Sequence, residues 1–262
     1  MEFETIKFDR ADGIARIVLD RPETGHAINR TFALEFMEAA LRTSTDPGVR
    51  CCLLTATGDM FGFGGDLKYF AGQTEQIEYR LIELTALVHQ GIQRLRHMDA
   101  PLIIAVNGMA AGGGFSMTLF GDIVLAARSA RFTMAYTRAG LSPDASSSYF
   151  LPRLVGLRRA QELILTNRVL DAGEALDWGL ITRVVDDDAL ADEAETLAQS
   201  IAAGPTRAYG AVKRLLGRSF EQALEVQLEE ESRHIGAMAA TADGREGLDA
   251  FLAKRRPTFR GE

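Results

Sequence analysis

Apolar residues along the first half of the chain alternate between strand-like runs and helical spacing. Four segments rich in Val, Ile, Leu and Ala are predicted to be buried strands: 14–20, 50–56, 102–106 and 122–126. Between them, apolar residues recur at helical spacing after Asn29, which can cap a helix, and again over 75–96. Since strands that alternate with helices pack as mixed layers, this pattern predicts an α/β fold.

The last third of the chain has a different pattern. After Val185 the spacing of apolar residues is almost purely helical, and Gly204-Pro205 and Gly217 separate the segments. The predicted helices span 187–203, 205–216, 220–239 and 244–253. We expect this helical tail to pack on the α/β body or on a partner subunit.

Composition narrows the class of protein. The 262 residues include 47% hydrophobic and 25% charged residues, which is ordinary for a globular protein and excludes disordered, collagen-like and coiled-coil classes. The net charge is -7 and no basic cluster is present, so we do not expect nucleic-acid binding. Cys51 and Cys52 are adjacent and form no disulfide framework, which fits a cytoplasmic location. The first residues do not resemble a signal peptide, and polar and glycine residues interrupt the apolar stretch 102–127, so we expect no membrane span.

Several common catalytic motifs are absent from the sequence. There is no P-loop, no dinucleotide-binding glycine pattern and no nucleophile elbow around Ser116. The four histidines and two cysteines do not have the spacing of metal ligands, so no metal site is expected.

Two glycine-rich loops, 61–67 and 107–114, each follow a predicted strand. Free backbone N–H groups in such loops can bind a negatively charged oxygen, and two facing loops can supply two donors to one oxyanion. The alternative is that these glycines only permit turns and tight packing, since a glycine loop alone is a weak motif.

Longer motifs identify a resemblance. The first loop is similar to the F-x-x-G-x-D-L run, and 106–114 to the V-N-G-x-A-x-G-G-G run, of the enoyl-CoA hydratase/isomerase (crotonase) superfamily. Further matching segments cover nearly the whole chain: Arg21-Pro22 with Ala27-Ile28-Asn29, 140–144, 151–153, 172–181 and 251–257. The resemblance is nearest to the phenylacetate-pathway enoyl-CoA isomerases and the 4-chlorobenzoyl-CoA dehalogenases.

The resemblance implies a crotonase-type ββα spiral with a C-terminal helical trimerisation region. Residues 1–200 would form the core that binds CoA and carries catalysis, and 201–262 the helical region. The substrate would be an acyl-CoA thioester, with CoA as its handle and no metal or redox cofactor. The family assembles as homotrimers, often paired into hexamers.

The resemblance also assigns candidate residues. The backbone N–H groups of Gly65 and Gly113 match the two oxyanion donors of the family. Lys68 and Arg21 are candidates for CoA contacts, although Lys68 could equally be a solvated surface lysine. Asp66 is more plausible as a carboxylate that structures its loop than as a catalyst. The remaining residues expected at the substrate are Ala27, Phe61, Phe63, Leu67 and Ser116.

The sequence departs from the hydratases of the family at both of their catalytic glutamates, where it has Ser116 and Tyr136. A hydroxyl and a phenol cannot replace two carboxylates near neutral pH, so the two-glutamate hydration route is not expected. Asp144 lies where two branches of the family have a functional aspartate. It is therefore the expected acid/base, and the alternative is a turn or cap before a helix that starts near Ser146.

His89 lies where the dehalogenases have a histidine base, but a pocket-lining or structural role is also open. The expected reaction is a shift of the double bond from 3-enoyl-CoA to 2-enoyl-CoA. In it Asp144 moves the proton, the two glycine N–H groups stabilise the dienolate, and Tyr136 and His89 are further catalytic candidates. A hydratase, a dehalogenase-like enzyme and a non-catalytic acyl-CoA-binding homologue are the alternatives.

Overall fold

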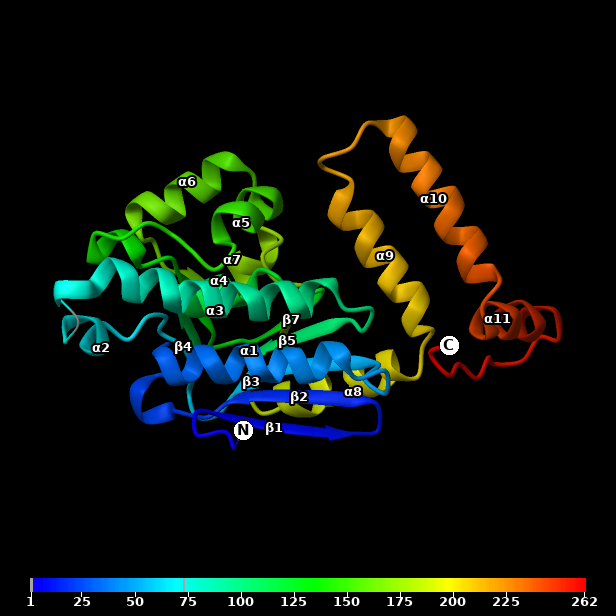
Figure 1. The fold of residues 1–262 in the computed structure, drawn as a ribbon, viewed down its shortest axis with the longest axis horizontal. Coiled ribbons are helices and arrows are strands. Elements are labelled where there is room, and N and C mark those ends of the chain that lie inside the picture. The colour runs from blue at the N-terminus through cyan, green and yellow to red at the C-terminus, as the bar shows by residue number, and fades with distance from the viewer. Residues whose placement is uncertain (1, 73) are drawn as a thin grey trace.

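The larger of two sheets forms the body of the molecule. The computed structural model describes residues 2–72 and 74–262, and Figure 1 shows their arrangement. In spatial order, the six strands of this sheet are β1 (Ile6–Ala11), β2 (Ile14–Leu19), β3 (Cys51–Ala56), β5 (Leu102–Val106), β7 (Ile123–Ala127) and β10 (Arg183–Val185). β1 and β2 form an antiparallel hairpin, and the other neighbours are parallel. The four predicted strands are confirmed as β2, β3, β5 and β7.

A smaller sheet lies beyond the carboxyl ends of the parallel strands. In spatial order, its strands are β4 (Met60–Gly62), β6 (Met109–Ala111), β8 (Arg131–Thr133) and β9 (Leu170–Asp171). β4, β6 and β8 follow β3, β5 and β7 in the chain, so each long strand continues into a short one. This repeated pairing is the predicted ββα spiral. It brings together the segments that follow β3 and β5, which are the two glycine loops.

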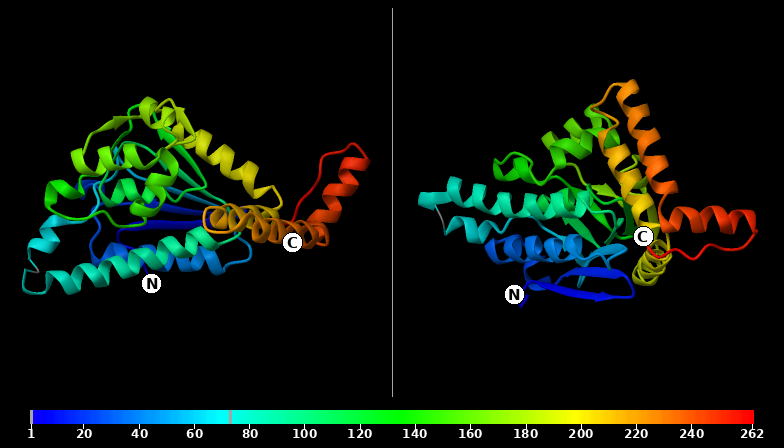
Figure 2. Two further views of the ribbon diagram at one scale, coloured as in Figure 1. Left: turned by 90° about the horizontal axis from the view of Figure 1, so that it is seen from above. Right: turned by 45° about the vertical axis from the view of Figure 1, so that its right-hand side comes forward.

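Helices cover both faces of the larger sheet. α1 (Arg30–Thr45) and α3 (Ile77–His97) pack on each other, and α8 (Leu190–Ala202) packs on β2, β3, β5 and β7. Figure 2 shows α8 on the face opposite α1 and α3. The shorter elements are η1 (Pro22–Thr24), α2 (Leu67–Ala71), η2 (Thr74–Gln76), α4 (Gly113–Thr118), η3 (Tyr136–Ala139), α5 (Ser147–Val155), α6 (Leu157–Thr166) and α7 (Ala172–Asp177).

The pairing of α1 with α3 follows from their sequences. Asn29 caps α1 as predicted, because its side-chain oxygen accepts a hydrogen bond from the Phe32 N–H at 3.0 Å. Phe32 and Phe36 are fully buried on the apolar face of α1. Gly91 of α3 lies against Phe36, and a Cβ added there would lie 2.7 Å from the ring. The missing side chain therefore lets the two helices approach closely.

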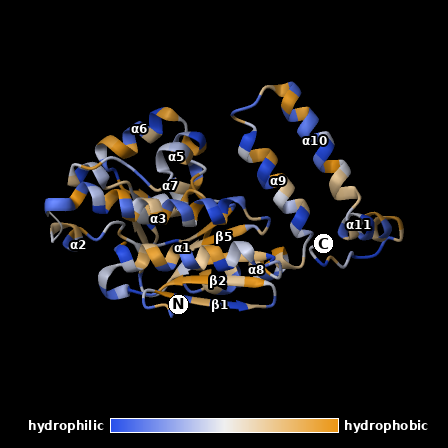
Figure 3. Cartoon of the chain, in the orientation of Figure 1, coloured by the Kyte–Doolittle hydropathy of each residue, from blue (hydrophilic) through white to orange (hydrophobic). Residues whose placement is uncertain are grey.

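The C-terminal helices extend away from the body in Figures 1 and 2. They are α9 (Thr206–Arg218), α10 (Leu224–Ala239) and α11 (Ala242–Leu252), close to the predicted positions. α10 has no buried residue, yet Figure 3 shows apolar positions along it and along α9. Within the described residues, no helix combines the length and hydropathy needed to cross a bilayer.

Candidate active site

The two glycine loops meet backbone against backbone. β4 pairs in parallel with β6, which aligns the loops that follow these strands. A Cβ added to Gly114 would lie 2.1 Å from the Gly62 carbonyl oxygen. One added to Gly64, whose φ is +87°, would lie 2.5 Å from the Gly113 nitrogen. Close packing is therefore one function of these glycines. The close approach of Gly64 to Gly113 was not predicted from the sequence, although the position of Gly64 within a glycine-rich run is typical of such contacts.

The same packing leaves two backbone N–H groups free. The Gly64 carbonyl accepts from Ile28 N at 2.7 Å, and the Asp66 N–H donates to the Ile28 carbonyl at 3.0 Å. The Gly65 N–H lies between these two groups and points away from Ile28, because successive residues of an extended segment alternate in direction. Gly113 is the first residue of α4, where an N–H has no acceptor within the helix. In the described part of the chain, neither amide donates to another residue.

A cavity of about 280 Å³ opens in front of Gly65 and Gly113. Phe63 and Leu67 lie at this cavity and are 46% and 59% exposed, whereas Ile28, Phe70, Leu84 and Val88 form a buried apolar part of its wall. Among the described lining residues, only Tyr136 and Asp144 are titratable. The apolar part of the wall includes Ile28, Phe70, Leu81, Leu84, Val88, Ala135, Ala139, Leu141 and Ala145.

Three polar side chains form a hydrogen-bonded chain beside the two glycine loops. The Tyr136 hydroxyl donates to Asp144 Oδ1 at 2.5 Å, and it lies 2.9 Å from Ser116 Oγ. Ser116 is fully buried on α4, and its hydroxyl also lies 3.2 Å from the Gly112 carbonyl oxygen. Burial, together with the Asp144 carboxylate, raises the pKa of Tyr136 far above its ordinary value. Tyr136 therefore stays protonated and acts as a hydrogen-bond donor.

Asp144 does not cap the following helix. α5 begins at Ser147, and its N-cap residue is Ser146, which makes no side-chain cap. The Asp144 backbone carbonyl accepts from the N–H and the hydroxyl of Ser147, but its carboxylate turns to Tyr136 and the cavity. The alternative of a capping carboxylate is therefore wrong for the side chain, although the backbone of Asp144 does form a turn.

His89 contacts the turn that carries Asp144. Its Nε2 accepts a hydrogen bond from the Ala145 N–H at 3.2 Å, so this nitrogen carries no proton in the bonded state. Ala145 and Ser146 have φ values of 48° and 68°, in the left-handed region that L-residues rarely adopt. His89 is not among the residues that line the cavity. The structure therefore places this predicted base candidate behind the Asp144 turn, where it supports a strained backbone.

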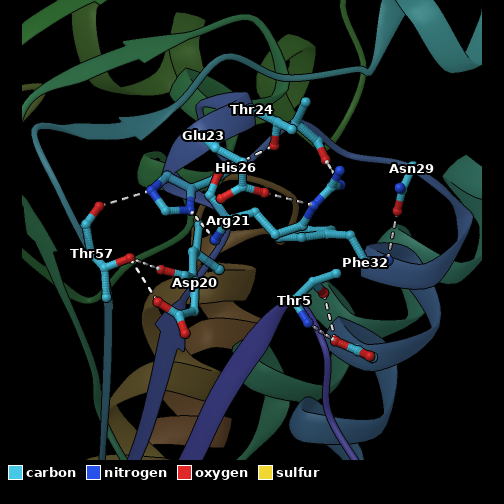
Figure 4. A network of polar contacts seen from close by, with 12 residues as sticks. Thr5, Asp20, Arg21, Glu23, Thr24, His26, Asn29, Phe32 and Thr57 are labelled. Carbon is cyan, nitrogen blue, oxygen red and sulfur yellow. Dashed lines mark hydrogen bonds and ion pairs between the residues drawn. The ribbon is translucent and has the colours of Figure 1, made fainter.

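A buried histidine organises the segment that holds Arg21 and Ala27, as Figure 4 shows. His26 Nδ1 accepts from the Arg21 N–H at 3.0 Å, and its Nε2 lies 2.9 Å from the Thr57 carbonyl oxygen, which can only accept. His26 is therefore neutral with the proton on Nε2, and burial lowers its pKa. The Arg21 guanidinium donates to the Ala27 carbonyl at 3.0 Å. No local sequence pattern indicates this role of His26.

Three further residues that were predicted near the substrate occupy different environments. Asp66 caps α2 by accepting from the Tyr69 N–H at 3.0 Å, which favours its loop-structuring role. Lys68 is exposed on α2. Phe61, expected to contact substrate, is instead fully buried in the core, because it lies within β4, whereas Phe63 follows in the loop.

Comparison with known proteins agrees with this fold. Residues 9–262 match the family model for enoyl-CoA hydratase/isomerase. The chain is 38% identical over 251 residues to 1,2-epoxyphenylacetyl-CoA isomerase of Escherichia coli strain K12, covering 95% of this chain and 96% of that protein. It is 34% identical over 250 residues to 4-chlorobenzoyl coenzyme A dehalogenase-2 of an Arthrobacter species, covering 95% and 91%.

Solved structures have the same architecture. An enoyl-CoA hydratase from Polaromonas sp. JS666 superposes with a TM-score of 0.92 at 30% identity, covering 97% of this chain and 99% of that one. An enoyl-CoA hydratase/isomerase from Cupriavidus metallidurans CH34 gives a TM-score of 0.90 at 30% identity, covering 100% and 98%. This chain belongs to the enoyl-CoA hydratase/isomerase (crotonase) superfamily, whose members act on acyl-CoA thioesters.

Proposed function

We propose that the protein is an enoyl-CoA isomerase that converts a 3-enoyl-CoA into the 2-enoyl-CoA. The Asp144 carboxylate removes a proton from C2, and the electrons move into the thioester to give a dienolate. The Gly65 and Gly113 N–H groups donate to the dienolate oxygen. Protonated Asp144 then returns the proton to C4, which leaves the double bond between C2 and C3. Substrate and product are isomers, so the reaction consumes no co-reactant.

The observation that carries this proposal is one carboxylate in a cavity with two free backbone donors. Among the described lining residues Asp144 is the only carboxylate. Hydration by paired carboxylates needs a second one, and the two positions that the resemblance points to hold the hydroxyls of Ser116 and Tyr136. A 1,3-proton shift needs only one group to take and return the proton, together with charge stabilisation at the oxygen.

Asp144→Asn tests the proposal directly. The change preserves side-chain size and removes the base, so kcat for a 3-enoyl-CoA should fall about 10²–10⁴-fold. KM should change little, because we place the CoA contacts at Arg21 and Lys68. The matched control is Asp188→Asn, an exposed aspartate outside the cavity, which should keep wild-type turnover. Near-full activity of Asp144→Asn would refute the proposed base. Acyl-CoA binding without turnover of any thioester by the wild type would indicate a non-catalytic homologue.

One observation favours a second candidate, a dehalogenase-like reaction. His89 contacts the backbone beside Asp144, and one relative at 34% identity is a 4-chlorobenzoyl coenzyme A dehalogenase. In this reaction the Asp144 carboxylate would attack the aryl carbon, chloride would leave, and water would hydrolyse the resulting ester. Chloride release from 4-chlorobenzoyl-CoA that is lost in His89→Gln would place this reaction first. No release, together with turnover of a 3-enoyl-CoA, would exclude it.

The C-terminal helices support an assembly of identical subunits. α10 contacts α9 and α11 but has no fully buried residue in the single chain, and a helix of 16 residues with exposed apolar positions is typical of an interface. Its exposed apolar residues include Leu224, Leu228 and Ile235, and α11 adds Phe251 and Leu252. We place residues 201–262 in a trimer interface, with pairing into hexamers as the larger assembly. Sedimentation as a monomer at micromolar concentration would refute this.

A further inference from the structure

The hydroxyl of Tyr136 lies between the carboxylate of Asp144 and the glycine loop that contains Gly113. It donates to Asp144 Oδ1 at 2.5 Å, and a Cβ added to Gly113 would lie 3.8 Å from it. Tyr136 is the first residue of η3, and Ala135 before it has a φ of 54°. The backbone therefore turns sharply where it directs the ring toward the cavity, into which only Asp144 and Tyr136 bring titratable groups among the described residues.

A carboxylate must present one oxygen to the substrate in a fixed orientation if it is to act as a base. Tyr136 supplies a short O–H···O bond, of the kind that a charged acceptor makes strong. This bond also occupies Oδ1, so the second carboxylate oxygen is the one available to take a proton from the substrate.

Ser116 extends the chain of hydroxyls behind Tyr136. It is fully buried on α4, and its Oγ lies 2.9 Å from the Tyr136 oxygen and 3.2 Å from the Gly112 carbonyl. Because Tyr136 gives its proton to Asp144, its oxygen can accept the Ser116 proton. Consecutive hydrogen bonds of this kind polarise one another and strengthen the bond to the carboxylate.

The groups around Asp144 come from three other elements. Tyr136 faces it from η3, and Ser116 acts through Tyr136 from α4. His89 of α3 faces the turn and accepts the Ala145 N–H, so it contacts the backbone rather than the carboxylate. Among the residues that the structure describes, no cationic side chain forms an ion pair with this carboxylate. The hydroxyl chain is therefore its polar support.

We propose that Tyr136, supported by Ser116, is a positioning residue that holds the Asp144 carboxylate in one orientation and so fixes which of its oxygens acts as the base. This inference rests on the proposed function, since it presumes that Asp144 is the base. It gives the hydroxyls of Ser116 and Tyr136 a defined role at the two positions where the family resemblance implies glutamates in the hydratases. The task is to support one carboxylate, and neither hydroxyl transfers a proton to the substrate.

The test compares kcat and KM for a 3-enoyl-CoA, together with thermal stability, in the wild type, Tyr136→Phe and Ser116→Ala. Tyr136→Phe keeps the ring and removes the hydrogen-bond donor. Its kcat should fall about 10-fold or more, because the carboxylate loses its fixed orientation, while KM stays within about threefold. Ser116→Ala should lower kcat in the same way by a smaller factor.

A merely structural role for Tyr136 would raise KM and lower thermal stability along with kcat. Wild-type kcat in Tyr136→Phe, or a loss of kcat that is matched by changes in KM and stability, would therefore overturn the inference. Should this variant not fold, kcat and KM of Ser116→Ala decide the question by the same criterion. Asp144→Asn separates the two proposals. Near-full turnover of that variant refutes the proposed function, whereas an inactive Asp144→Asn with wild-type kcat in Tyr136→Phe refutes only this inference.

Discussion

Gly64→Ala should displace the two proposed oxyanion donors without changing a side chain that we place at the substrate. A Cβ at this position would lie 2.5 Å from the Gly113 nitrogen and 3.1 Å from the Ala111 carbonyl oxygen. Both neighbours are backbone atoms, so no flexible side chain can move aside. The loops must separate by about half an ångström before the first distance reaches 3.0 Å, the limit below which real Cβ contacts are essentially not seen.

This displacement is large for a catalytic site, because reacting groups must be held within about 0.5 Å of their productive geometry. Losing one oxyanion donor costs about 10²–10³ in kcat, which corresponds to about 2.7–4 kcal/mol. We therefore expect Gly64→Ala to lower kcat for a 3-enoyl-CoA by about 10²–10³-fold. KM should change less, since the donors act most strongly on charge that develops in the transition state. Formation of the conjugated 2-enoyl thioester, followed by its absorbance, measures both.

The substitution also strains the backbone, so it needs a control for stability. Gly64 has a φ of +87°, and an alanine in the left-handed region costs about 1–2 kcal/mol. Gly179→Ala has a similar φ of +77°, but its nearest neighbour would lie 3.8 Å away, outside the cavity. Both variants should lose free energy of unfolding to the strained φ, Gly64→Ala should lose more because of its backbone clash, and only Gly64→Ala should lose activity. Wild-type turnover in Gly64→Ala would refute the assignment of Gly113 as a donor.

Two further predictions concern stability, and one concerns specificity. Burial lowers the pKa of His26 below its ordinary 6.5, so the folded chain binds fewer protons than the unfolded chain. The stability that neutral His26 contributes to the folded state is complete above about pH 6.5 and is lost as the pH falls through the pKa of the folded state. The free energy of unfolding, measured with urea, should therefore fall less steeply with acid in His26→Gln than in the wild type. Lys213→Met removes the ion pair with Asp122 at 2.7 Å and the bond to the Ala100 carbonyl at 2.9 Å. It should lower the free energy of unfolding by about 2–3 kcal/mol, and an unchanged urea midpoint would contradict this. Wild-type protein should hydrate crotonyl-CoA far more slowly than it isomerises a 3-enoyl-CoA, and the opposite order would contradict the isomerase proposal.

The hydropathy pattern was sufficient for the regular core. β3 and β5 are continuous apolar runs buried on both faces, so their sequence carries a strong signal. β1 was missed because it is an edge strand with charged residues and one buried position, Ile6. The turn that follows β1, at Asp12-Gly13, has φ values of 55° and 76°. An Asp-Gly pair is typical of a β-hairpin, but this hairpin was not predicted. The short strands of the second sheet are too brief to give a period.

The glycine loops could also be found from the sequence, because glycine is required where backbones approach each other this closely. The family resemblance of these loops implies that Gly65 and Gly113 are donors. The contact of one loop with the other, which sets Gly64 against the Gly113 nitrogen, depends on the pairing of β4 with β6. Strand pairing between distant segments is a tertiary property, which local propensity does not encode.

The polar side of the site depended still more on the tertiary structure. The sequence by itself placed Ser116, Tyr136 and Asp144 as separate candidates, and it left His89 between a base and a structural role. Only the fold places the three hydrogen-bonding side chains in contact and sets His89 against the Ala145 N–H. The physical reason is that spacing along a chain predicts which face of its own element a side chain occupies, whereas its partners depend on how α3, α4 and the turn after η3 pack around one cavity.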